Sequence, residues 1–146
     1  VLFDISGNCF ALDHKLLKQT YSKDAFFSER AERAKRIKVL LSGRDIPLYD
    51  LSRMFGGETS KKKITDRDAM LVKDKSEHMV LLADRIEEVV EIKEEDIRKL
   101  PAVFGKRAIK CFPQLFVENG LAVLIMDLSE IRAIAEDENK QLREDQ

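Results

Sequence analysis

The chain has 146 residues, of which 44% are hydrophobic, enough for one domain with a sizeable core. Its 26 lysines and arginines nearly balance its 27 aspartates and glutamates, so no net field favours nucleic acid or an anionic membrane surface. No apolar run is long enough for a membrane-spanning helix, and the first residues lack the pattern of a signal peptide. We therefore expect a cytoplasmic protein with no nucleic-acid partner and no direct membrane insertion.

Two cysteines, Cys9 and Cys111, lie far apart in the chain, and each precedes a phenylalanine. Apolar neighbours favour buried free thiols over a disulfide, and free thiols fit a reducing compartment. The cysteines therefore agree with a cytoplasmic location.

Short apolar runs at 1–5 and 9–12 flank a Ser-Gly-Asn turn and predict a β-hairpin. The following stretch has no glycine or proline up to Ser42, and good helix formers occupy 28–37. We therefore predict a helical insertion near 15–38.

An apolar strand follows the insertion, with Ile46 and Leu48 on either side of Pro47. Proline lacks an N–H donor, which predicts an edge strand or a bulge at this position. The residues 52–55 fit one helical turn, and a polar loop follows them.

Two apolar strands are predicted at 69–72 and 79–83, whereas 84–92 is ambiguous between a helix and a bent strand. A short helix begins at Glu94, and 108–112 is predicted as a strand.

The strongest turn signal is Asn119-Gly120, which joins the runs 114–117 and 121–126 into a predicted hairpin. From residue 128 onwards, apolar residues recur at helical spacing and predict a C-terminal helix over 128–146. Short strands separated by turns, with few helices, indicate a mostly β protein built of small barrels.

The residues that carry chemistry form no recognisable site. His14 and His78 have no partner at metal-ligand spacing, no serine lies in a nucleophile elbow, and no glycine-rich phosphate cradle occurs. Asp50 and Asp127 each follow an apolar strand and precede a predicted helix, so we expect their carboxylates to accept backbone N–H bonds there. We therefore predict a non-enzymatic protein with no catalytic, cofactor-binding or metal-binding residues.

Three segments together resemble CheW-like domains, the adaptors of bacterial chemosensory arrays. The stretch 40–55, LLSGRDIPLYDLSRMF, resembles the family pattern Asn-Leu-Arg-Gly-x-x-Ile/Val-Pro-x-x-Asp-Leu-x-x-x-Phe. The segment 79–92, MVLLADRIEEVVEI, resembles the family's Val-x-Asp-x-Val-x-Glu-Val run, and 120–128, GLAVLIMDL, resembles its closing strand. Their order and spacing match the family over nearly the whole chain.

The resemblance implies a single domain over 1–146 made of two SH3-like five-stranded β-barrel lobes that share a hydrophobic interface. We expect the first lobe to take strands from about 1–13 and 36–75, and the second from about 79–127. The C-terminal helix 128–146 then completes the domain.

The resemblance also implies an adaptor that couples the regulatory domain of a CheA-type histidine kinase to the cytoplasmic tip of a methyl-accepting chemoreceptor. Other CheW-like domains are a further expected class of partner, and recruitment to arrays at the inner membrane is the expected setting. The candidate partner-binding residues lie around the strand that contains Pro47: Leu40, Ser42, Arg44, Ile46, Leu48 and Arg53.

Departures from the family pattern leave alternatives open. Ser42 replaces the family's arginine before glycine, with Arg44 two positions later, and Val80 stands where the family usually has glycine. Within the insertion, Tyr21, Phe26 and Phe27 are either a lid on the core, which we favour, or an anchor for a partner.

One alternative function is a divergent module that keeps the fold but binds a different protein or blocks array assembly. Another is a β-barrel that binds a small ligand or acts as an enzyme. The lack of convergent histidine, cysteine, serine or paired carboxylates argues against this second alternative.

Overall fold

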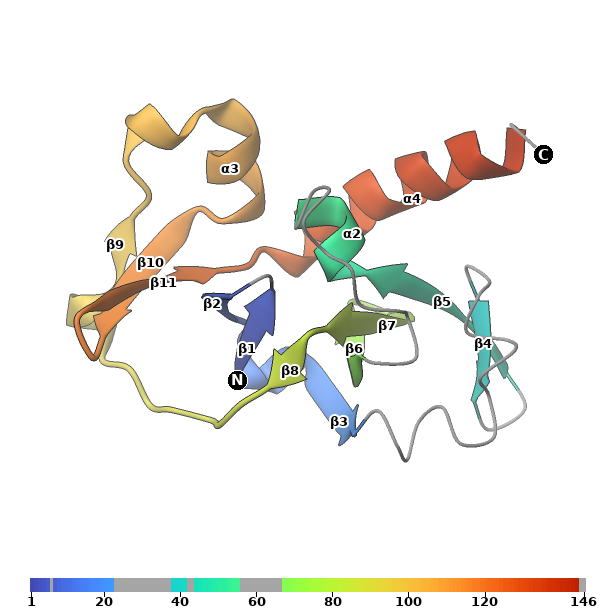
Figure 1. Cartoon of the computed structure of the whole chain (residues 1–146), viewed down its shortest axis with the longest axis horizontal. Coiled ribbons are helices and arrows are strands. Elements are labelled where there is room, and N and C mark those ends of the chain that lie inside the picture. Colours follow the sequence, from blue (N-terminus) through green and yellow to red (C-terminus); the bar gives the residue numbers. More distant parts are fainter. Residues whose placement is uncertain (6, 23–37, 42–43, 56–66, 145–146) are drawn as a thin grey trace.

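The computed structural model describes residues 1–5, 7–22, 38–41, 44–55 and 67–144. These residues form two β-sheets and a few helices (Figure 1), which confirms the mostly β prediction. The six-stranded sheet has the order β8 (Arg85–Ile86), β1 (Leu2–Ile5), β2 (Asn8–Ala11), β11 (Leu121–Ile125), β10 (Gln114–Glu118), β9 (Arg98–Lys99). The five-stranded sheet has the order β3 (Leu17–Tyr21), β6 (Asp68–Asp74), β7 (Glu77–Ala83), β5 (Arg44–Asp50), β4 (Lys38–Leu41).

The helices connect or cover these sheets. The α-helices are α2 (Leu51–Phe55), α3 (Lys106–Cys111) and α4 (Leu128–Glu144), and the 3₁₀ turns are η1 (His14–Leu16), η5 (Glu94–Asp96) and η6 (Ala102–Phe104). Among the described residues, no helix combines the length and apolar character that a membrane span requires. Neither sheet closes on itself within the described residues, so the SH3-like barrels remain a prediction.

Both predicted hairpins are present. The strands β1 and β2 pair antiparallel, and Gly7 takes a φ of 83° in the turn between them. The strands β10 and β11 pair antiparallel around Asn119 and Gly120, whose φ values are 50° and 77°. Positive φ at both turn positions is the backbone requirement that makes Asn-Gly a strong hairpin signal.

The predicted helical insertion near 15–38 is wrong for Leu17–Tyr21, which forms strand β3 and pairs antiparallel with β6. Tertiary contacts explain the difference, because Leu17 and Tyr21 pack against two buried clusters while the residues between them remain exposed. Pairing with a neighbouring strand thus overrides the local helix preference. The predicted helix over 28–37, with Phe26 and Phe27, lies outside the described residues.

The predicted strand at 108–112 is also wrong, because residues 106–111 form α3. Gly105 adopts a φ of 86° immediately before the helix, and the Phe112 amide donates to the Ala108 carbonyl at 2.8 Å. The short apolar run Ala108–Phe112 is compatible with either structure by periodicity alone.

Strand membership differs from the predicted division between lobes. The strands β1 and β2, expected in the first lobe, belong to the six-stranded sheet, in which β2 pairs parallel with β11. Strand β7, expected in the second lobe, lies between β6 and β5 in the five-stranded sheet. After residue 83 the chain therefore leaves the five-stranded sheet and joins the six-stranded sheet, which also contains the first hairpin.

Pro47 does not lie on an edge strand, since β5 stands between β7 and β4. The two ladders of β5 cover different residues: Arg44–Pro47 are in register with β4, and Leu48–Asp50 are in register with β7. Pro47 therefore needs no partner on the β7 side, which explains why an interior strand accepts it.

The main hydrophobic core joins the two sheets and the first turns of α4. Its fully buried members include Phe3, Ile5, Met70, Val72, Leu81 and Ile131. Aromatic contacts extend the core towards α2 and α3, with ring centroids 5.1 Å apart for Phe10 and Phe112 and 5.2 Å apart for Phe55 and Phe112. Both cysteines are free thiols, Cys111 buried and Cys9 half-buried.

Candidate protein-binding surface

The six candidate partner-binding residues lie on or beside β4, β5 and α2, but the structure describes only some of their side chains. Leu40 lies in β4 and Arg44 begins β5, whereas Ser42 lies outside the described residues. Arg53, in α2, has an exposed side chain. This edge of the five-stranded sheet lies at the opposite end of the molecule from β9 (Figure 1).

Ile46 and Leu48 do not offer an exposed apolar face. Their side chains are 8% and 4% exposed and pack with Ala69, Val80 and Leu82 in a second buried cluster. Strand β5 therefore uses these residues to stay attached to its own sheet. Of the candidates with described side chains, Arg53 is the one that a partner can reach.

The two aspartates predicted to cap helices do so. Asp50 Oδ1 accepts from the Ser52 amide at 3.0 Å where β5 becomes α2. Asp127 Oδ1 accepts from the Ser129 amide at 3.1 Å where the chain enters α4. Each carboxylate satisfies an N–H that has no partner within its own helix.

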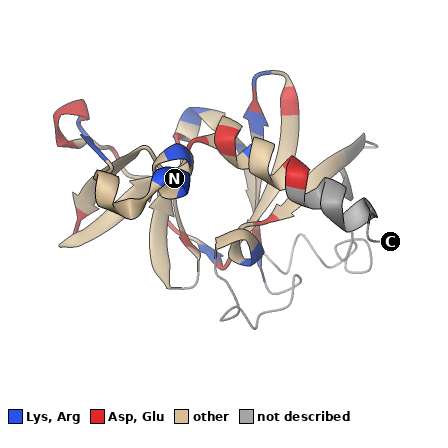
Figure 2. Ribbon diagram, turned by 90° about the horizontal axis from the view of Figure 1, so that it is seen from above, with Lys and Arg blue, Asp and Glu red and all other residues tan. Residues whose placement is uncertain are grey.

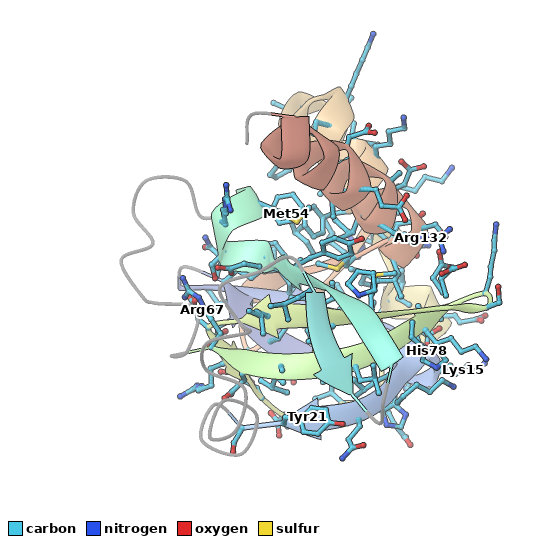
Figure 3. The ribbon with its side chains drawn as sticks, turned by 90° about the vertical axis from the view of Figure 1, so that its right-hand side faces the viewer. Lys15, Tyr21, Met54, Arg67, His78 and Arg132 are labelled. Carbon is cyan, nitrogen blue, oxygen red and sulfur yellow. The ribbon has the colours of Figure 1, made fainter. Side chains whose placement is uncertain are left out.

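A buried charge network lies beside α2. The Arg67 guanidinium forms an ion pair with Asp84, and its Nε lies 3.6 Å from Asp50 Oδ1. The Ser52 hydroxyl donates to Asp84 Oδ1 at 2.7 Å. Arg67 is 1% exposed, so the sequence places a full positive charge inside the protein between two carboxylates. Figure 3 shows Arg67 close to α2.

Burial raises the pKa of the Asp50 carboxyl, while Arg67 and the backbone N–H donors of α2 act in the opposite direction. Two carboxylates share one arginine here, so desolvation is only partly compensated. Removing Arg67 would therefore leave two neighbouring carboxylates without a cation.

A second polar contact joins α4 to the turn between β6 and β7. The Ser129 hydroxyl lies 3.0 Å from both Asp74 carboxylate oxygens, and Arg132 Nη2 lies 3.3 Å from Asp74 Oδ2. Figure 3 shows Arg132 on α4, on the opposite side of the view from Arg67. The two contacts brace the five-stranded sheet against neighbouring elements at two separate places.

One group of side chains has the donor types of a metal site. The ligand atoms of Asp4, Cys9 and Glu87 all lie within 4.8 Å of one another. Arg85 already contacts both carboxylates, with Nη2 2.5 Å from Glu87 Oε1 and 3.8 Å from Asp4 Oδ2. Burial raises the pKa of Asp4 and of the Cys9 thiol. We therefore interpret the group as an ion-pair cluster.

Surface features absent from the sequence analysis include two exposed apolar residues in η6, Val103 and Phe104, and two beside the β10–β11 turn, Val117 and Leu121. Each of these side chains has at least one apolar sequence neighbour, so periodicity gives no sign that these particular side chains are exposed. Acidic and basic segments lie interspersed along the described ribbon (Figure 2), which agrees with the near-zero net charge.

Comparison with known proteins gives a consistent result. A family model described as CheW-like domain matches residues 1–136. Among solved structures, the chain is similar to the crystal structure of the scaffolding protein TtCheW from Thermoanaerobacter tengcongensis, with a TM-score of 0.68 and 23% sequence identity. The match covers 88% of this chain and 82% of that one. No curated protein matches significantly.

The likeness to the solved structure supports the fold, and the family model matches residues 1–136 of a chain of 146. The order of motifs in the sequence and the two-sheet architecture agree with this family match. The chain belongs to the family of CheW-like domains.

Proposed function

We propose that this protein is a non-enzymatic adaptor of bacterial chemosensory signalling, which couples a CheA-type histidine kinase to chemoreceptors. The single observation that carries the proposal is the CheW-like family match over residues 1–136. The similar solved structure is that of a scaffolding protein, which agrees with an adaptor role. The proposal includes two lobes that each close as an SH3-like barrel, and a single domain that contains all residues.

An adaptor acts through geometry, since it must hold two partners in a fixed relation to transmit a conformational bias from one to the other. The continuous hydrophobic core between the sheets supplies that rigidity, because Phe3 from one sheet and Leu81 from the other are both completely buried in it.

We place the kinase-docking surface on β4, β5 and α2. Leu40 and Arg44 lie on its strand side and Arg53 lies on its helix side, and the candidate Ser42 lies outside the described residues. Ile46 and Leu48 support this surface from within, because both are buried. A partner therefore contacts the strand edge and the charged rim rather than these two side chains.

Titration calorimetry with the regulatory domain of the CheA-type kinase from the same organism tests this placement. We expect measurable binding to the wild type and at least about tenfold weaker binding to Arg53→Glu, because charge reversal at an interface rim opposes association. Lys93→Glu is the matched control, since Lys93 is exposed in the segment between β8 and β9.

Two results would contradict the proposal in different ways. Equal binding by wild type and Arg53→Glu would move the docking surface away from α2. No binding by a folded wild-type sample would favour the alternative of a divergent module with another protein partner, in line with Ser42 in place of the family's arginine.

A further inference from the structure

Helix α2 contains only five residues, Leu51–Phe55. A helix of this length cannot be stable on its own, because nucleation costs more than so few hydrogen bonds return. Its position must therefore come from contacts with the rest of the protein. Leu51 supplies an apolar anchor, since it is completely buried in the main core.

The polar anchors of α2 converge on one arginine. Asp50 caps the helix through the Ser52 amide, and the Ser52 hydroxyl donates to Asp84. Arg67 lies between these two carboxylates, paired with Asp84 and 3.6 Å from Asp50. The start of α2 is thus tied to Asp84 directly through Ser52 and indirectly through Arg67.

Asp84 is itself fixed at the crossing between the two sheets. It follows β7 of the five-stranded sheet and precedes β8 of the six-stranded sheet. Its amide donates to the Asp4 carbonyl on β1 at 2.9 Å. Next to Arg67, the Asp68 carboxylate accepts from the Ile86 amide at 3.0 Å, so residues 67 and 68 hold both sides of the crossing.

We propose that Arg67 is a positioning residue, which holds the carboxylates of Asp50 and Asp84 together and thereby sets the orientation of α2 at the junction of the two sheets. An apolar side chain at this position would fill the space but would leave two neighbouring carboxylates without their shared cation. Repulsion between them would separate the start of α2 from the crossing.

The consequence for partner binding rests on the proposed function. Arg53 lies in α2 and is exposed, so an orientation set by Arg67 also sets where Arg53 meets a partner. A change at the buried Arg67 is therefore expected to weaken docking without touching the partner.

NMR of the full chain tests the positioning role without any partner. In Arg67→Met, we expect the amides of α2 to show conformational exchange on the microsecond-to-millisecond timescale, with shift changes at least about fivefold larger than those of β10 and β11. In Arg67→Lys, which keeps the charge, the shift changes of the α2 amides should be at most about half of those in Arg67→Met. A purely stabilising role would lower the unfolding midpoint and leave the α2 signals as in the wild type, which would overturn the proposal.

Arg85→Met is the matched control, because Arg85 also pairs with carboxylates at the crossing but is exposed. It should leave the α2 signals unchanged, and equal disturbance of α2 by both variants would overturn the assignment to Arg67. If Arg67→Met does not fold, Ser52→Ala decides, because it removes only the 2.7 Å bond to Asp84. Unchanged α2 signals in Ser52→Ala would then refute the network's role.

Calorimetry with the kinase regulatory domain separates this inference from the proposed function. We expect Arg67→Met to bind at least about fivefold more weakly than the wild type, since ordering a loosened helix opposes association. Absence of wild-type binding would contradict the proposed function, while the NMR result would still decide the role of Arg67.

Discussion

Two arginines near the crossing between the sheets contact the same kind of partner in opposite surroundings. The side chain of Arg67 is 2% exposed and pairs with Asp84, whereas that of Arg85 is 67% exposed and pairs with Glu87 and Asp4. The side chain of Arg132, which pairs with Asp74, has an intermediate exposure of 22%. The comparison teaches that a residue's role here follows its surroundings, because removing a buried partner leaves uncompensated charge while water screens an exposed one.

The largest effect is expected at Arg67. Arg67→Met should lower the free energy of unfolding by about 3–5 kcal/mol, the usual cost of breaking a buried ion pair by removing one partner. Urea unfolding followed by circular dichroism measures this change. A loss no larger than that of an exposed pair would remove the distinction between the two arginines.

A smaller effect is expected where α4 meets the β6–β7 turn. Ser129→Ala removes the hydroxyl that lies 3.0 Å from both Asp74 oxygens, and should cost about 1–2 kcal/mol because Arg132 still pairs with Asp74. The same unfolding measurement compares it with wild type. A cost as large as that of Arg67→Met would show that burial does not rank these contacts.

The pH dependence of stability gives a finer test of the buried network. The pKa of Asp50 is raised in the folded state. The favourable contribution of this carboxyl to folding stability is therefore complete below its ordinary pKa of 3.8, and it is lost as pH rises through the raised pKa. Asp50→Asn keeps an oxygen that can accept from Ser52 and removes the titration. We therefore expect wild type to lose stability relative to Asp50→Asn as pH increases from 4 to 7.

Denaturant unfolding of both proteins across that range isolates Asp50, because the other titrating groups are common to the pair. A difference that stays constant with pH, or changes in the opposite direction, would contradict the raised pKa.

The smallest effect is expected at Arg85. Arg85→Met should leave the unfolding midpoint unchanged within experimental error, because the Arg85 side chain is 67% exposed and water screens its contacts with Glu87 and Asp4. Repeating the measurement at high salt should give the same result for both proteins. A clear loss of stability would place Arg85 in the same class as Arg67.

The sequence predicts those parts of the fold that depend on local chemistry. Asn119-Gly120 specifies its hairpin because both residues must adopt positive φ, and Asp50 and Asp127 accept the N–H bonds expected of them. These signals need only a few neighbouring residues, so they can be interpreted before any tertiary structure is known.

Features that depend on contacts between residues far apart in the chain could not be predicted from the sequence. Leu17–Tyr21 is a strand because it pairs with β6, and the placement of β7 depends on partners on both sides. Arg67 follows a polar stretch and shows no local sign of burial, although it is among the least exposed side chains in the protein. Ile46 and Leu48 belonged to the predicted docking surface, but alternation alone does not tell which face of a strand is buried.

The most direct test of the account is whether the chain joins its two proposed partners in one complex. The purified chain would be mixed with the kinase regulatory domain and a receptor cytoplasmic hairpin, and the masses of the complexes would be measured by analytical ultracentrifugation. We predict a species that contains all three proteins and that forms only when the chain is present. Binding to one partner that excludes the other, or to neither, would contradict an adaptor that couples them.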